Sequence, residues 1–313
     1  MEGWGNIVVR FASYGDLMLL FGLSLFGLYG VKGEAARAHA AFGFPRLLSG
    51  LAGLGILLAV AGMVLLAEAM SGVTGIAKLE PHVFGMIITG TQVGIAWMVR
   101  IASLLGIFSC AWFYGHSPAR SLVLASLLAA VALSTLVWSG HGAMDSGMRG
   151  GIHLVADTFH LLAAGAWVGA LAAFLMLLRR PGRADAYEHL LRLRRAVTGF
   201  SAAGTLIVAT LIVTGVVNYL LIVGPSLRGI ASGPYGVLLL VKLVLFAAML
   251  ALAAANRFRL APMLERARAH TEIASAKKAL LKSLAFETAA VTLILLLVAW
   301  LGTLSPSAGT RPH

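Results

Sequence analysis

Three residues able to bind a metal ion share one face of a predicted helix. His153, Asp157 and His160 are spaced i, i+4 and i+7, and at 3.6 residues per turn these positions lie on one stripe. The following segment, Leu161 to Leu178, has no charged residue. The pattern therefore predicts two imidazoles and a carboxylate on a membrane-spanning helix. Ionisable side chains are costly to keep in lipid, so they indicate a functional site.

A short segment just before this helix adds further metal donors. His141 and Met144 lie between Ser139 and Met148. Imidazole binds zinc, copper, nickel and iron, while a thioether selects Cu(I). Histidine and methionine without a thiolate fit copper chemistry outside the cytoplasm, where thiols oxidise. We therefore predict an outward-facing copper site formed by His141, Met144, His153, Asp157 and His160. Its carboxylate either binds the metal or orients an imidazole.

Each of these residues has a simpler alternative role. His153, near the membrane interface, could be merely solvated. His141 could be an ordinary loop histidine, and Met144 an interfacial apolar residue. Asp157 and His160 could form a structural pair that bridges two helices. These last two are the hardest to dismiss, because both lie inside the apolar run.

Two basic residues, Arg100 and Lys242, fall inside predicted spans and need partners. The acids available on the same side are Asp16, Glu68 and Asp157. One interpretation is a charge network that sets the protonation of the site carboxylates. In the other, the basic side chains extend to the nearby membrane interface. The sequence leaves both interpretations open.

The composition defines the class of protein. Of 313 residues, 59% are hydrophobic and 12% are charged, against roughly a quarter charged in soluble proteins. Apolar runs of about 20 residues recur, which predicts an all-α integral membrane protein. The net charge of +12 would suggest nucleic acid in a soluble protein, but here Lys and Arg collect in loops, so we expect no nucleic-acid binding. The single cysteine, Cys110, excludes an internal disulfide and a Cys-x-x-Cys metal motif.

Eight membrane-spanning segments can be drawn, with a short additional helix over Pro81 to Gly90 between the second and third. Arg100 interrupts the third span. The predicted spans are Tyr14–Val31, Leu48–Met70, Thr91–Tyr114, Leu122–Ser139, His153–Leu178, Phe200–Val223, Tyr235–Asn256 and Leu284–Leu304.

Charge in the connecting loops predicts the orientation. The loops 32–47, 179–195 and 257–282 are rich in Lys and Arg, whereas loops 71–90, 140–152 and 224–234 have one each. Basic loops face the cytoplasm, so we expect both termini to be periplasmic in a bacterial inner membrane. Glu287, near the inner end of the last span, is interpreted as a helix-terminus acid rather than a proton-coupling residue.

A weak internal repeat divides the single membrane domain into residues 1–140 and 141–313, with four spans each. Gly94 and Gly236 are each followed six positions later by a basic residue, Arg100 and Lys242. Asp16 and Asp157 also occupy similar places in the first span of each half. Equal span counts predict parallel repeats about the membrane normal. Close helix contacts are expected at the small-residue motifs Gly90-x-x-x-Gly94 and Gly165-x-x-x-Gly169.

Several short motifs give the chain a family resemblance. It resembles the CopD/PcoD copper-resistance family of inner-membrane proteins, and the likeness covers most of residues 139–260. The matching stretches are Ser139-Gly-His141, Asp157-x-x-His160, the run Leu161 to Gly169 with Trp167, Thr214 to Asn218, Tyr235 to Lys242, and Asn256-Arg257-Phe258.

The resemblance implies eight spans and copper movement across the inner membrane, commonly into the cytoplasm. It also implies a periplasmic copper-binding partner of the CopC type. It ranks Asp157 and His160 above His153, and it adds Trp167 and Asn218 as supporting residues. The sequence departs from the pattern in two ways, because it contains neither a CopC-like β-domain nor a methionine-rich repeat.

The leading functional hypothesis is copper import through the outward-facing site. No Gly-x-x-x-x-Gly-Lys-[Ser/Thr] motif is present, so transport would be passive or ion-coupled, and no motif indicates an enzyme. A second hypothesis is a b-type haem protein, whose axial histidines usually come from two facing spans; only His141 could pair with His160. A third is an assembly factor that hands copper to a membrane cuproenzyme.

Overall fold

The computed structural model describes residues 2–29, 43–73, 75–139, 147–179, 186–225, 233–266 and 270–304. Within these ranges the chain is helical and has no strand, and eight helices are long and apolar enough to cross a membrane. The prediction of an all-α membrane protein with eight spans is therefore confirmed. The long helices are α1 (Glu2–Tyr29), α3 (Phe44–Ser71), α5 (Gln92–Trp112), α6 (Pro118–Ser134), α7 (Gly147–Arg179), α8 (Ala186–Ile222), α10 (Gly233–Ala255) and α12 (His270–Leu301).

Local sequence explains where several helices begin and end. The predicted short helix is present as α4 (Pro81–Gly90), with proline at its first position, where a missing N–H costs nothing. Thr91 then begins α5 by accepting a hydrogen bond from the Gly94 backbone N–H at 3.0 Å. α3 ends before Gly72, whose φ of 69° is a left-handed conformation that favours glycine. Arg100 interrupts the apolar run of the third predicted span but does not break the helix, because α5 is continuous from Gln92 to Trp112.

Some helices extend well beyond the predicted spans. α8 begins at Ala186 and α12 at His270, so much of the segments 179–195 and 257–282, predicted as loops, is helical. In the second of these, the π-helix η5 (Asn256–Leu260) and α11 (Ala261–Arg266) continue directly from α10. The spans are predicted from hydropathy, which detects only the apolar part of a helix. The helix itself, with its backbone hydrogen bonds, extends beyond that part into polar residues outside the membrane.

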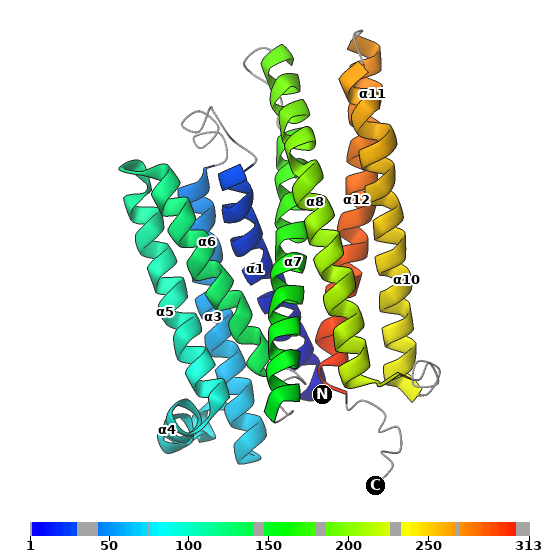
Figure 1. Ribbon diagram of the computed structural model, residues 1–313. Coiled ribbons are helices and arrows are strands. Elements are labelled where there is room, and N and C mark those ends of the chain that lie inside the picture. Colours follow the sequence, from blue (N-terminus) through cyan, green and yellow to red (C-terminus); the bar gives the residue numbers. More distant parts are fainter. Residues whose placement is uncertain are drawn as a thin grey trace.

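The helices form an up-and-down bundle with α1 and α7 at its centre (Figure 1). α3, α5 and α6 lie on one side of this pair, and α8, α10 and α12 on the other. Three glycines allow the central pair to approach closely. A Cβ on Gly22 of α1 would meet the Gly165 carbonyl oxygen at 2.1 Å, and a Cβ on Gly169 would meet the Gly22 backbone at 2.1 Å. The expected close contact at Gly165-x-x-x-Gly169 is confirmed.

The other small-residue motif is only partly used. A Cβ on Gly94 would meet the Ile87 carbonyl oxygen of α4 at 2.1 Å, so this glycine lets α4 fold back against α5. Gly90 has no atom within 4 Å of such a Cβ. The motif therefore serves the tight connection between α4 and α5 through one glycine, not through both.

The packing of the two groups of four helices is similar but not equal. α1 packs against α3 and α6, and α7 against α8 and α12; α5 packs against α6, and α10 against α12. In the first group α3 also packs along α5, whereas the corresponding α8 and α10 make much less contact. The division at residue 140 stays a prediction.

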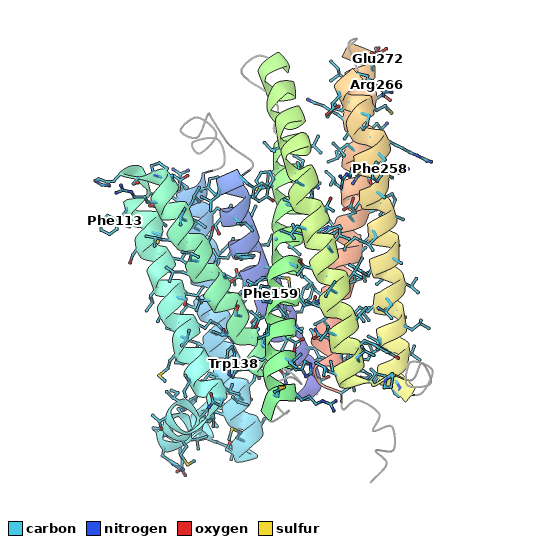
Figure 2. All side chains as sticks on the ribbon, in the orientation of Figure 1. Phe113, Trp138, Phe159, Phe258, Arg266 and Glu272 are labelled. Atoms are coloured by element: carbon cyan, nitrogen blue, oxygen red, sulfur yellow. The ribbon has the colours of Figure 1, made fainter. Side chains whose placement is uncertain are left out.

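The two ends of the described chain meet at one end of the bundle. The rings of Trp4 and Trp300 lie 6.3 Å apart, and a Cβ on Gly302 would meet the Arg10 guanidinium at 2.4 Å. α1 therefore begins where α12 ends, which places both on the same side of the membrane. Arg266 and Glu272 mark the opposite end (Figure 2).

Candidate metal site

Asp157 is the hub of a polar cluster that joins three helices. Its Oδ1 accepts a hydrogen bond from Asn218 Nδ2 of α8 at 2.6 Å. Its Oδ2 lies 3.7 Å from His153 Nε2, one turn earlier on α7. On α10, Lys242 and Tyr235 interact electrostatically with the same carboxylate. One side chain of α7 thus orients polar groups from α8 and α10.

His160 is held by a contact that decides which ring nitrogen carries the hydrogen. Its Nδ1 lies 2.9 Å from Thr214 Oγ1 on α8. The Thr214 hydroxyl donates its single hydrogen to the Thr210 carbonyl oxygen at 2.6 Å, so it can only accept from the imidazole. The neutral His160 ring therefore carries its hydrogen on Nδ1. Its Nε2 keeps a lone pair, which is the form that binds metal ions.

His153 is more deeply buried than its place in the sequence suggests. Only 1% of its side chain is exposed, although it lies in the first turns of α7. The simple alternative of a solvated interfacial histidine is therefore wrong. His153 belongs to the cluster through its approach to the Asp157 carboxylate, one turn later on α7.

The two basic residues inside membrane-spanning helices, Arg100 and Lys242, have different partners. Lys242 interacts electrostatically with Asp157 and with His160. Arg100 instead donates from Nε to Thr135 Oγ1 of the adjacent 3₁₀ turn at 2.8 Å. Lys242 is thus electrostatically coupled to the cluster, while Arg100 bonds to a hydroxyl.

The other two acids stay apart from the cluster. Glu68 Oε1 accepts from the Gly75 backbone N–H at 2.9 Å and so closes the turn after α3. Asp16 is 4% exposed, and both of its carboxylate oxygens lack a hydrogen-bond partner among the described residues. It faces Gly55 of α3, where an added Cβ would meet Asp16 Oδ2 at 2.8 Å. Within the described ranges, neither acid forms an ion pair with Arg100 or Lys242.

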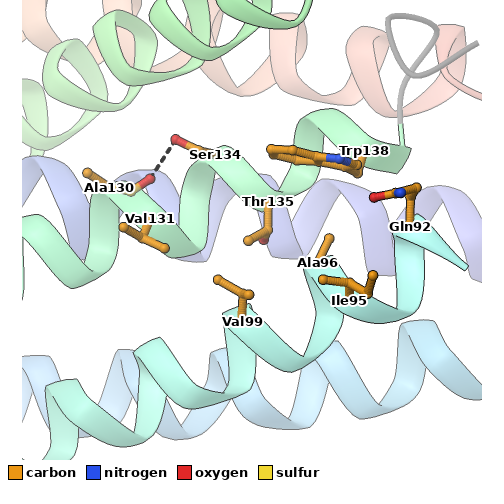
Figure 3. A pocket seen from close by; sticks show the side chains of 9 residues that line it. All are labelled: Gln92, Ile95, Ala96, Val99, Ala130, Val131, Ser134, Thr135 and Trp138. Atoms are coloured by element: carbon orange, nitrogen blue, oxygen red, sulfur yellow. Dashed lines mark hydrogen bonds between the residues drawn. The ribbon is translucent and has the colours of Figure 1, made fainter. Parts of the chain in front are cut away.

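A small cavity of about 320 Å³ lies between α5 and the segment of α6 and the following 3₁₀ turn that contains Thr135, the partner of Arg100. Figure 3 shows its lining, in which Ser134 donates to the Ala130 carbonyl oxygen at 2.7 Å. Thr135 likewise donates to the Ala132 carbonyl oxygen. No side chain lining this cavity is ionisable, so it has no donor set for a metal ion.

The interpretation of Glu287 as a helix-terminus acid is wrong. This residue lies in the middle of α12 (His270–Leu301) and not at a helix end, and it is 2% exposed. Its carboxylate accepts hydrogen bonds from Asn256 Nδ2 and from the Trp167 indole. Trp167 thus serves this second polar group, away from the Asp157 cluster.

Two predicted ligands, His141 and Met144, lie outside the described residues. Within the ranges that are described, no three His, Cys, Asp or Glu side chains converge on a point that could hold a metal ion. The cluster of His153, Asp157 and His160 is therefore at most part of a ligand set. The five-residue copper site stays a prediction.

Comparison with known proteins decides the family. Residues 1–152 match the family model described as copper resistance protein D-like, N-terminal domain, and residues 194–301 match copper resistance protein D. The chain is 48% identical to "Copper resistance protein D" of Pseudomonas syringae pv. tomato, over 98% of each chain. It belongs to the copper resistance protein D family.

The name of a more distant relative bears on where this CopD family protein is located. The chain is 28% identical to "Inner membrane protein YebZ" of Escherichia coli K12, over 83% of this chain and 86% of the relative. With its eight apolar helices, this CopD protein is a multi-pass inner membrane protein with a role in copper resistance. No solved structure matches the chain.

Sequence reasoning did not assign Thr214, Tyr235 or Asn256 to a site. Thr214 lies four residues before Asn218 on α8, and Tyr235 lies seven before Lys242 on α10. Both spacings place the pair on one helical face. This periodicity could have identified the first two, because each shares a face with a residue that was already predicted. Asn256 lacked a predicted neighbour of this kind.

Proposed function

We propose that this CopD family protein imports copper from the periplasm into the cytoplasm through the cluster on α7, α8 and α10, without catalysing a reaction. The observation that carries the proposal is His160, whose contact with Thr214 leaves the Nε2 lone pair available. Family membership supplies the metal, and imidazole is a good ligand for copper.

The surrounding residues suit a site that binds copper and releases it again. Asp157 is shared between Asn218 and His153, and Lys242 interacts electrostatically with it, so a positive charge near the carboxylate opposes an entering cation. Conduction requires sites that bind strongly enough for entry and weakly enough for exit. His141 and Met144 complete the ligand set on the outer side, where a CopC-like periplasmic protein delivers the ion.

The proposal is tested by uptake of Cu(I), kept reduced with ascorbate, into proteoliposomes that contain a fluorescent Cu(I) chelator. We expect His160→Ala to lower the uptake rate at least tenfold. The matched control is His82→Ala, because His82 is an exposed residue of α4 that pairs with Glu80 at 2.9 Å. It should transport at the wild-type rate.

Other results would favour a different function. Wild-type protein that binds copper but takes none into the vesicles would support the assembly factor that hands copper to a cuproenzyme. A Soret band in the purified protein would support the haem hypothesis. Protein that neither binds nor transports copper would contradict the proposal outright.

A further inference from the structure

A buried carboxyl group on the first helix lies outside the cluster described above. Asp16 of α1 is 4% exposed, and neither of its carboxylate oxygens has a hydrogen-bond partner among the described residues. An added Cβ on Gly55 of α3 would meet Asp16 Oδ2 at 2.8 Å and the Leu104 side chain of α5 at 3.1 Å. Asp16 therefore lies where α1 meets α3 and α5, inside a membrane-spanning helix, and an ionisable residue there indicates a function.

The surroundings of Asp16 favour its protonated form. An ionised carboxylate that is buried without a donor or a counter-ion costs far more free energy than a neutral carboxyl in the same place. Asp157, at a similar place in the second half of the chain, accepts a hydrogen bond from Asn218 at 2.6 Å and interacts electrostatically with Lys242. One carboxyl thus has partners suited to a charge, and the other has none in this arrangement.

Among the described residues, the ionisable side chains of three neighbouring helices lie away from Asp16. Arg46 and Glu68 of α3 are about 14 Å and 20 Å from Gly55 along the helix axis. Arg120 is in the first turn of α6. On α12, Glu287 bonds to its own partners on other helices, and Lys277, Lys278 and Lys282 lie farther still from the end that meets the start of α1.

The candidate ligands on α7 lie across α1 from Asp16. α7 approaches α1 at Met18 and Gly22, which are about 200° and 240° around the helix from Asp16. His153, Asp157 and His160 are therefore on the other side of α1. On α1 itself, Arg10 lies against Gly302, beyond the end of α12.

One basic side chain, Arg100 of α5, is placed to pair with the ionised form of Asp16. Arg100 precedes Leu104 by one turn and interacts electrostatically with Tyr14, two residues before Asp16 on α1. It donates to Thr135 through Nε, which leaves the terminal nitrogens of its guanidinium for another acceptor. Within the described ranges Arg100 and Asp16 do not form an ion pair, so a pairing requires α1 to move relative to α5.

α1 connects this carboxyl to the copper cluster. Gly22 follows Asp16 by six residues, about 9 Å along the helix axis, and its backbone meets Gly165 and Gly169 of α7. Gly165 in turn follows His160 by five residues. Because the two backbones touch here without side chains between them, a movement of α1 is transmitted to α7.

We propose that Asp16 is a proton-binding site, protonated in the arrangement described here, whose ionised form pairs with Arg100. When the pair forms, the proton leaves the carboxyl and passes to water on the side of the membrane to which the site opens. The coupling of this exchange to copper rests on the proposed transport function, since the movement of α1 reaches the cluster on α7. Copper import is then proton-coupled rather than passive.

The first test is independent of transport and detects the proton itself. Infrared spectra of wild-type protein and Asp16→Asn at neutral pH should differ by the carbonyl stretch of a protonated carboxyl, and isotope-labelled aspartate should shift this band in the wild type. The matched control is Glu272→Gln, at an exposed position of α12, which should instead remove carboxylate bands. A loss of carboxylate bands in Asp16→Asn would show an ionised Asp16 and would overturn the proton site.

The second test measures coupling in proteoliposomes. The external pH is held constant, so that the outer imidazoles are unaffected, and the internal pH is varied. We expect the initial rate of Cu(I) uptake by wild-type protein to change about fivefold between an internal pH of about 6 and about 8, a typical coupling. Asp16→Asn should take up copper at a rate independent of internal pH while keeping the wild-type copper affinity and thermal midpoint. Glu272→Gln should respond as wild type.

Arg100 variants test the proposed partner of the ionised carboxyl. Arg100→Gln should lose the dependence on internal pH, and Arg100→Lys, which keeps the charge, should retain it. An equal response to internal pH in wild type and Asp16→Asn would overturn the coupling. If wild-type protein takes up no copper at all, the transport proposal fails, and the infrared measurement alone decides whether Asp16 binds a proton.

Discussion

At the scale of single residues, the hydrogen bond between His160 and Thr214 is the detail with the clearest chemical consequence. It assigns the imidazole hydrogen to Nδ1 without any metal being present, because the threonine hydroxyl is already committed to the Thr210 carbonyl oxygen. A partner that fixes the ring and its tautomer makes a histidine a better ligand, and removing such a partner typically costs about 10- to 100-fold in metal affinity.

This contact predicts a loss of copper affinity in Thr214→Val. Valine has the same shape but cannot accept from Nδ1, so Cu(I) affinity measured by competition with a chelator should fall by about 10- to 100-fold. Thr214→Ser keeps the hydroxyl and should bind as wild type. Unchanged affinity in Thr214→Val would show that the hydrogen bond does not position a ligand.

The use of neutral imidazole also predicts a pH dependence. A protonated histidine has no lone pair for a metal, and the ordinary imidazole pKa is about 6.5. Copper affinity should therefore fall as the pH is lowered through the range in which the site imidazoles become protonated. The measurement is a Cu(I) titration between pH 5 and 8 with a chelator calibrated at each pH. Affinity that rises toward acid pH would contradict an imidazole site.

At the scale of helices, α1 and α7 cross at a close approach that depends on glycine. Gly169→Ala would bring a Cβ to 2.1 Å from the Gly22 backbone, so the helices must separate. We expect a loss of about 1–3 kcal/mol in stability, seen as a lower thermal midpoint in detergent. Gly151→Ala, also on α7 but without an atom within 4 Å, is the control and should not be destabilised.

Asp157 of α7 and Lys242 of α10 interact electrostatically, and this coupling can be separated from ligand chemistry. Asp157→Asn or Lys242→Met alone removes one of two opposite charges that interact and should lower the thermal midpoint. The double variant removes both charges and should recover much of that loss. Thermal unfolding of the four proteins gives the coupling. Additive losses would mean that the two side chains do not stabilise each other.

At the scale of the whole molecule, the structure puts both ends of the described chain on one side, and the charged loops determine which side. Loops rich in Lys and Arg face the cytoplasm, so alkaline phosphatase fused to the C-terminus should be active in the periplasm. A green fluorescent protein fused there should be dark. The same phosphatase inserted at residues 180–185 should be inactive, and the reverse pattern would invert the proposed direction of transport.

The sequence alone determined the eight helices, the short helix at Pro81 and the stripe of His153, Asp157 and His160. These features depend on local periodicity and hydropathy, which are properties of neighbouring residues. The tertiary structure decided which side chains meet. Of the three acids available to Lys242, Asp157 is the one with which it interacts electrostatically. Arg100 bonds to Thr135, and Glu287 accepts hydrogen bonds from Asn256 and Trp167. Such partners depend on the depth and rotation of separate helices, and packing between helices sets both.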